Sequence, residues 1–325
     1  MVAKEWWEAR WKFILAAMVF LAVAVLVPRS FEKIKADIQQ DIKWAQEEEV
    51  DDYGFYSEGS LEGGPEGPLV QEEISEKERR QFKRENQRHI ERLSKPEYAA
   101  NSAKWNLRSD HQFASFGIML PLAGLLGVAL VSGEVSRGSV LLLLSKPMGR
   151  NRILLTKYAV GTVCLLVVAL LGGLAMILSA FARGYPPESV GIGWIMGSAT
   201  LIWLGSLFVL GVALLASVIF KDVLRTLIAA AVAVYVTISI PEILRIPLEL
   251  FYLTRGEYER NWRLVERWYE SFEVFRLTNY WSLGDLYGGF PGAQQTSPWI
   301  SFAVCIVTAA IPLLAAIWLF RRKTY

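Results

Sequence analysis

Few residues in this chain have the types and spacing that catalysis or metal binding requires. Its two histidines, His89 and His111, lack ligand spacing, and no Cys/His pair or His-x-x-x-His string accompanies them, so zinc chemistry is disfavoured. Binding of a nucleotide needs backbone donors and a lysine around the phosphates, yet no Gly-x-x-x-x-Gly-Lys-Ser/Thr string occurs. We therefore expect no enzyme activity, no metal and no cofactor on this chain.

The most informative residues lie in one basic segment, residues 132–157, between two apolar runs. Its single acid is Glu134, against the cations Arg137, Lys146, Arg150, Arg152 and Lys157. An excess of Lys and Arg in a short loop marks the cytoplasmic side of a membrane. Between these charges stand four consecutive leucines, too few to span a bilayer. They predict a short helix that lies flat and docks its apolar face on another protein: Leu141, Leu142, Leu143 and Leu144.

This segment resembles the first cytoplasmic loop of ABC-2-type permeases, the membrane subunits of type V ABC exporters. The resemblance rests on the order of Glu, Gly-Ser, a leucine pair, Pro, Arg and Lys, with Ser139 where Thr is commoner in the family. It implies a coupling helix that contacts an ATPase, made by Glu134, Arg137, Gly138, Leu141, Leu142, Leu143, Leu144, Pro147 and Arg150. The ATPase signature Leu-Ser-Gly-Gly-Gln is missing from the sequence. The resemblance thus implies two separate ATPase chains that bind ATP and Mg²⁺, and a second permease chain, identical or paralogous.

Within the segment, Glu134 needs a compensating cation. It stands near the predicted C-terminal end of a membrane helix, where the helix dipole disfavours an anion. Arg137, at position i+3, is the local candidate for that cation. Pro147 is predicted to end the short helix, because proline removes a backbone donor.

Long apolar runs must position this segment. Hydrophobic residues make up 53% of the chain and gather in stretches, as in a multi-pass membrane protein. We predict an all-α fold with six transmembrane helices, and Lys and Arg in the short loops place both termini in the cytoplasm. The partner of these helices is the lipid bilayer of a prokaryotic plasma membrane, and no nucleic-acid partner is expected. The predicted spans are Phe13–Pro28, Phe113–Val131, Tyr158–Phe181, Val190–Phe220, Arg225–Ile240 and Trp299–Phe320.

Two long segments are predicted outside the membrane. In the insertion at 29–111, Phe31, Ile34 and Ile38 recur at helical spacing, and Ile74–Leu93 is rich in helix-forming residues, which predicts a helical hairpin or cap. We expect this insertion to serve as an external gate, as a docking surface or as a solvated spacer without substrate contact. In the segment 241–298, prolines predict a broken, re-entrant stretch. Its aromatic residues, Trp281 among them, predict either a membrane-interface belt or a platform that contacts substrate.

The predicted spans hold many small residues and almost no charges. Gly193-x-x-x-Gly197, followed by Gly205 and Gly211, allows close helix packing, either within one subunit or between two. Scarcity of ionisable residues disfavours an ion-coupled pump and suits an apolar or amphipathic substrate. We expect a permease that exports a lipid, a peptide antibiotic or a cell-envelope component. The alternative is a transmitter that moves no cargo, in which ATPase cycling shifts the external cap to regulate an envelope protein.

Overall fold

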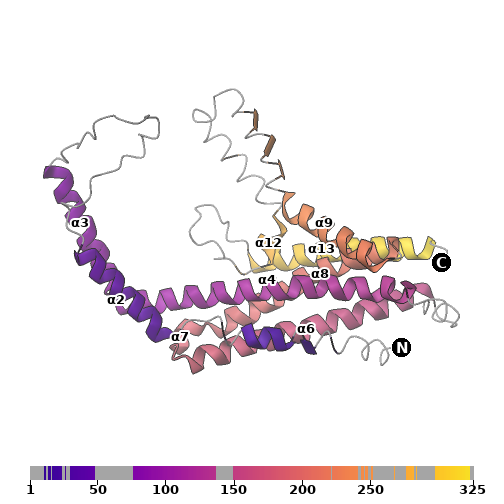
Figure 1. The fold of residues 1–325 in the computed structure, drawn as a ribbon, viewed down its shortest axis with the longest axis horizontal. Helices are drawn as coiled ribbons and strands as arrows, with labels where there is room; N and C mark the ends of the chain where they lie inside the picture. The colour runs from indigo at the N-terminus through magenta and orange to yellow at the C-terminus, as the bar shows by residue number, and fades with distance from the viewer. Residues whose placement is uncertain are drawn as a thin grey trace. The chain divides into compact units, whose positions relative to one another are not determined.

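The computed structural model describes residues 11, 14–15, 17–23, 26, 30–47, 76–136, 149–220, 222–240, 243–244, 246–247, 250–251, 267, 276–281, 283 and 297–322. Throughout these ranges the regular elements are α-helices (Figure 1), as predicted. In chain order they are α2 Phe31–Glu47, α3 Glu76–Leu93, α4 Pro96–Ser136, α6 Arg150–Ala182, α7 Pro187–Val190, α8 Ile192–Ile219, α9 Val223–Ile238, α12 Leu277–Tyr280 and α13 Pro298–Arg322.

Four of these helices are long and apolar enough to cross a membrane. They are the stretches Pro96–Val135, Asn151–Ala182, Pro187–Ile219 and Pro298–Arg322, and they contain the predicted second, third, fourth and sixth spans. The predicted fifth span corresponds to α9, which is apolar but has 16 residues, fewer than the ~20 that a full crossing needs. The described residues of the predicted first span, among them 17–23, are helical, but the others lie outside the described residues. A total of six spans and the orientation of the termini therefore stay predictions.

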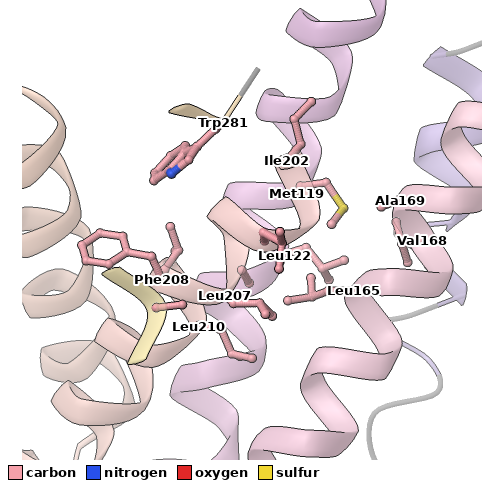
Figure 2. Packing of buried hydrophobic residues seen from close by; sticks show 14 of the residues in the cluster. Met119, Leu122, Leu165, Val168, Ala169, Ile202, Leu207, Phe208, Leu210 and Trp281 are labelled. Atoms are coloured by element: carbon pink, nitrogen blue, oxygen red, sulfur yellow. The ribbon is translucent and has the colours of Figure 1, made fainter. Parts of the chain in front are cut away.

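One of two compact units contains the main core. It comprises residues 1–28, 108–179 and 191–325, whereas residues 29–107 and 180–190 form the other unit. Helix α8 packs against α9, α12 and α13. It is also the most buried of the four candidate spans, at 83% of its apolar window. A helix surrounded by protein has no polar face to keep in water, so its sequence is apolar on every side. Figure 2 shows Ile202 and Leu210 of α8 among Met119 and Leu122 of α4 and Leu165 and Val168 of α6.

Glycines on α8 make slots for neighbouring side chains. A Cβ on Gly205 would overlap the ring of Trp281, and one on Gly211 would come within 2.9 Å of Pro312 Cγ. These small residues thus serve packing within one subunit, the first of the two predicted roles. Gly193 differs, since a Cβ there would meet nothing within 4 Å.

Trp281 lies in this core and not at a surface. Its side chain is 0% exposed, and its ring centroid lies 6.2 Å from that of Phe116 and 6.3 Å from that of Phe208 (Figure 2). The interface belt is therefore wrong for this residue, whereas the platform that contacts substrate stays a prediction. The glycine slot opposite the indole explains why an amphipathic side chain is buried here.

The second unit has a small core of its own. Helix α2 forms where helical spacing predicts it and α3 where helix-forming residues predict it, and Ile34 and Ile38 are both buried. Asn86 Nδ2 donates a hydrogen bond of 2.7 Å to the Ala45 carbonyl, which joins α3 to α2. Phe31 N–H donates to the Arg183 carbonyl at 3.2 Å, so the start of α2 is tied to the turn after α6. The location of this unit outside the membrane stays a prediction.

The helix that contains the predicted second span begins much earlier than expected. Helix α4 starts at Pro96 and not near Phe113, and Pro121 lies within it. Its buried residues include His111, with no exposed surface, and Glu134, while Lys157 of α6 is also buried. These three ionisable residues lie just outside the predicted spans Phe113–Val131 and Tyr158–Phe181, but within the longer helices α4 and α6 that contain them.

Candidate functional site at the connector

The connector is the segment between the end of α4 and the start of α6. Of the residues predicted to contact an ATPase, Glu134 is described in full, and Arg150 begins α6. The other seven lie outside the described residues: Arg137, Gly138, Leu141, Leu142, Leu143, Leu144 and Pro147. The coupling helix itself therefore stays a prediction, and the structure shows how the helices on either side of the connector are held.

A buried ion pair joins the two helices that lead into the connector. Lys157 Nζ lies 2.9 Å from Glu134 Oε1, with the two side chains 2% and 6% exposed. The expected cation is thus supplied by the next helix, whereas Arg137, the local candidate, falls outside the described residues. Because a charge buried without a partner costs several kcal/mol, the pair holds the end of α4 against the first turns of α6.

Hydrogen bonds join the same end of α4 to α8. The backbone N–H of Ser132 donates to Ser217 Oγ at 2.7 Å, and Ser217 Oγ donates to the Val128 carbonyl at 3.2 Å. Ser132 Oγ also donates to the Val128 carbonyl, at 2.6 Å. The three residues are all buried, so these bonds form away from competing solvent, where each contributes about 1 kcal/mol.

Helix α13 completes the support of this end. Arg321 Nε donates to Asn151 Oδ1 at 2.9 Å, joining the end of α13 to the start of α6. An apolar cluster lies beside this bond and draws on four helices: Val131, Leu154, Leu214, Val218, Ala316 and Phe320. Both ends of the connector therefore leave from one packed junction of α4, α6, α8 and α13.

This arrangement is suited to transmitting force. The described residues contain no group of His, Cys, Asp or Glu that could hold a metal ion. A displacement of the connector acts on helices that are fixed to one another by an ion pair, hydrogen bonds and apolar packing.

Sequence reasoning missed the partners that make this junction. Lys157 is recognisable as part of the loop pattern, and a buried lysine needs an anion. Its pairing with Glu134 could therefore have been predicted from the sequence. Ser217 and Arg321 gave no such signal, because each acts across 85 or more positions, on Ser132 and on Asn151.

Comparison with known proteins bears on the whole chain. The family model described as ABC-2 family transporter protein matches residues 2–324. Among curated proteins no match was found.

Proposed function

The chain belongs to the ABC-2 transporter family, and from this membership we propose that it couples ATP hydrolysis on a separate ATPase chain to outward movement of a substrate. The family makes it a membrane-spanning permease. The substrate would be a lipid, a peptide antibiotic or a cell-envelope component. The complex would contain two ATPase chains and a second permease, identical or paralogous, in a prokaryotic plasma membrane. The family match over nearly the whole chain is the observation that carries this proposal.

Coupling would begin at the connector. The leucines at 141–144 would occupy an apolar groove on the ATPase, and burial of each methylene there would contribute about 0.8 kcal/mol. Arg137 and Arg150 would pair with acids around that groove. Movement of the ATPases would then displace the connector. The junction of α4, α6, α8 and α13, with the ion pair of Glu134 and Lys157 in it, supports this role because it would pass the displacement on to the bundle.

The test uses the reconstituted complex of permease and ATPase. We expect Leu142→Asp or Leu143→Asp to release the ATPase or to uncouple its hydrolysis from candidate amphiphiles, because a carboxylate does not enter an apolar groove. Leu142→Met is the matched control, since it keeps an apolar side chain of similar volume and should behave as the parent chain. Normal assembly and normal stimulation in both aspartate variants would refute the coupling helix.

A non-transporting transmitter is the second candidate, and the separate compact unit at 29–107 and 180–190 favours it. In that case ATPase cycling would move α2 and α3 to regulate an envelope protein. Deletion of residues 31–93 distinguishes the two functions. If amphiphiles still stimulate ATP hydrolysis after the deletion, the chain transports; if stimulation depends on the deleted helices alone, it transmits a signal.

A further inference from the structure

A second group of side chains with buried polar atoms lies far along α4 from the connector. It is called the polar cluster below and consists of His111, Gln112 and Ser115 of α4 with Trp194 and Ser198 of α8. His111, Gln112, Ser115 and Ser198 are each 2% exposed or less. The His111 and Trp194 rings meet edge to face, with centroids 6.5 Å apart. Polar side chains in a candidate membrane span indicate function more often than packing.

Buried polar atoms of the cluster lack partners within the described part of the chain. These atoms are Nδ1 and Nε2 of His111, Nε2 of Gln112, Oγ of Ser115, Nε1 of Trp194 and Oγ of Ser198. The backbone of Ile195 lies near the imidazole but not in hydrogen-bonding geometry. Since buried polar groups are nearly always paired in folded proteins, a group of five such residues indicates that something else completes the site.

The unmet groups are mostly donors. An indole N–H and the nitrogen of a carboxamide can only donate, a hydroxyl can donate, and a neutral imidazole carries one N–H. None of the five side chains is acidic. Arg108, one turn before His111 on α4, adds a positive charge, with Cζ 4.7 Å from the centre of the Trp194 ring. Asp110 is the neighbouring acid in sequence, and it falls about 100° away from His111 around the helix. An oxyanion is the ligand that such a set of donors and one cation would accept.

The surroundings indicate that the oxyanion belongs to an amphiphile. Met119 and Leu122 follow the cluster along α4 and lie in the apolar core, so a bound headgroup has apolar side chains next to it. Both helices that form the cluster are candidate membrane spans. A lipid-like molecule would place its charged group among the donors and its chains along the helices or in the bilayer.

The contact between α4 and α8 allows the cluster to open. The two helices run parallel, because His111 faces Trp194, Gly127 faces Ala213, and Ser132 faces Ser217. Toward the connector the two helices approach closely, since a Cβ on Gly127 would lie 2.6 Å from the Cβ of Ala213. At the polar cluster the His111 ring lies against the Trp194 ring and near the backbone of Ile195, so separation of the helices there would leave the contact at Gly127 in place.

We propose that the polar cluster binds the oxyanion headgroup of an anionic amphiphile. This inference rests on the proposed function, since it names the substrate class of the exporter. In the present structure the site is closed, and binding accompanies separation of α4 and α8 at this end.

The binding test uses the full-length chain purified in a neutral detergent, with affinity measured by titration calorimetry. The probes are short-chain phosphatidic acid, the matching diacylglycerol without phosphate, and inorganic phosphate. We expect phosphatidic acid to bind and diacylglycerol not to bind. Inorganic phosphate should bind at least tenfold more weakly than phosphatidic acid, a difference of about 1.4 kcal/mol in binding free energy. Equal affinity for inorganic phosphate would overturn the amphiphile assignment. Absence of phosphatidic acid binding would also overturn the proposal.

Two serines of α8 provide a matched pair of variants. Ser198 Oγ has no partner among the described residues, so Ser198→Ala removes no hydrogen bond from the folded chain. Ser206 is equally buried, but its hydroxyl donates to the Trp203 carbonyl at 2.6 Å. We expect Ser198→Ala to weaken phosphatidic acid binding about tenfold, the order for a hydrogen bond to a charged group, and Ser206→Ala to leave it unchanged. An affinity within twofold of the parent chain in Ser198→Ala would overturn the proposal.

The reconstituted complex separates this inference from the proposed function. If phosphatidic acid binds but never stimulates ATP hydrolysis, export fails while the site stands. If only uncharged amphiphiles stimulate hydrolysis and phosphatidic acid does not bind, export stands while the site fails.

Discussion

Replacing Lys157 with methionine tests the ion pair that holds the two ends of the connector together. At an effective dielectric constant of about 20, unit charges 2.9 Å apart attract by about 6 kcal/mol. The cost of taking both charges out of water offsets much of that attraction, so the net value of the pair is small. Loss of one partner is different, because Glu134 then stays buried as an uncompensated charge. We expect Lys157→Met to lower the free energy of unfolding by about 3–5 kcal/mol.

The measurement is equilibrium unfolding in mixed micelles, with helix content followed by circular dichroism as the denaturing detergent increases. Glu134→Gln combined with Lys157→Met removes both charges, and the double variant should be at least about 1 kcal/mol more stable than Lys157→Met alone. Arg225→Met is the control. Its pair with Asp222 spans 3.9 Å, with side chains 79% and 57% exposed, so its loss should cost no more than about 0.5 kcal/mol. If Lys157→Met destabilises no more than this control, or if the two buried substitutions simply add, the pair does not stabilise the junction.

Three further predictions concern the packing of α8, its bond to α4 and the topology of the chain. Gly205→Ala should destabilise the bundle by about 1–3 kcal/mol, because the new Cβ would overlap a buried indole ring. Gly193→Ala, the control, should be neutral or slightly stabilising. Equal effects of the two substitutions in the unfolding assay would contradict the glycine slot. Ser217→Ala removes the hydroxyl that joins α8 to α4 and should cost about 1–2 kcal/mol in the same assay, and a cost of zero would show that the bond is dispensable. In a background with both native cysteines replaced by alanine, an impermeant maleimide should label Ser60→Cys in intact cells and Ser139→Cys only in opened ones; the reverse pattern would invert the predicted topology.

Local patterns predicted the helices well. Apolar residues at helical spacing, such as Ile34 and Ile38, gave the buried face of α2, and hydropathy located the four long candidate spans. Both signals arise within a few turns of one helix, so they can be recognised in a short stretch of sequence. The small residues of α8 likewise indicated close packing, because a glycine lets a neighbouring segment approach the helix whichever part of the chain that segment comes from.

Features that depend on contacts between helices distant in sequence were not predicted. Arg108, His111 and Gln112 read as an aqueous segment, because hydropathy measures preference for lipid and not burial against another helix. The start of α4 was therefore placed too late. The burial of Trp281 was not predicted for the same reason, since its slot at Gly205 lies far away in sequence. For Glu134 the local rule offered Arg137, whereas the partner that the structure shows comes from the following helix.

The way α8 contacts its neighbours limits how it can move. Gly205 receives a tryptophan ring, Gly211 receives a proline ring, and the α4 backbone at Gly127 lies directly on Ala213. Rotation of α8 about its own axis would replace these glycines with larger side chains and drive both rings out of their places. Tilting keeps the same sides of α8 toward these neighbours. Conformational change in this bundle would therefore proceed by inclination of intact helices, and a spin label on α8 should change its distance to other helices while keeping the same side toward them.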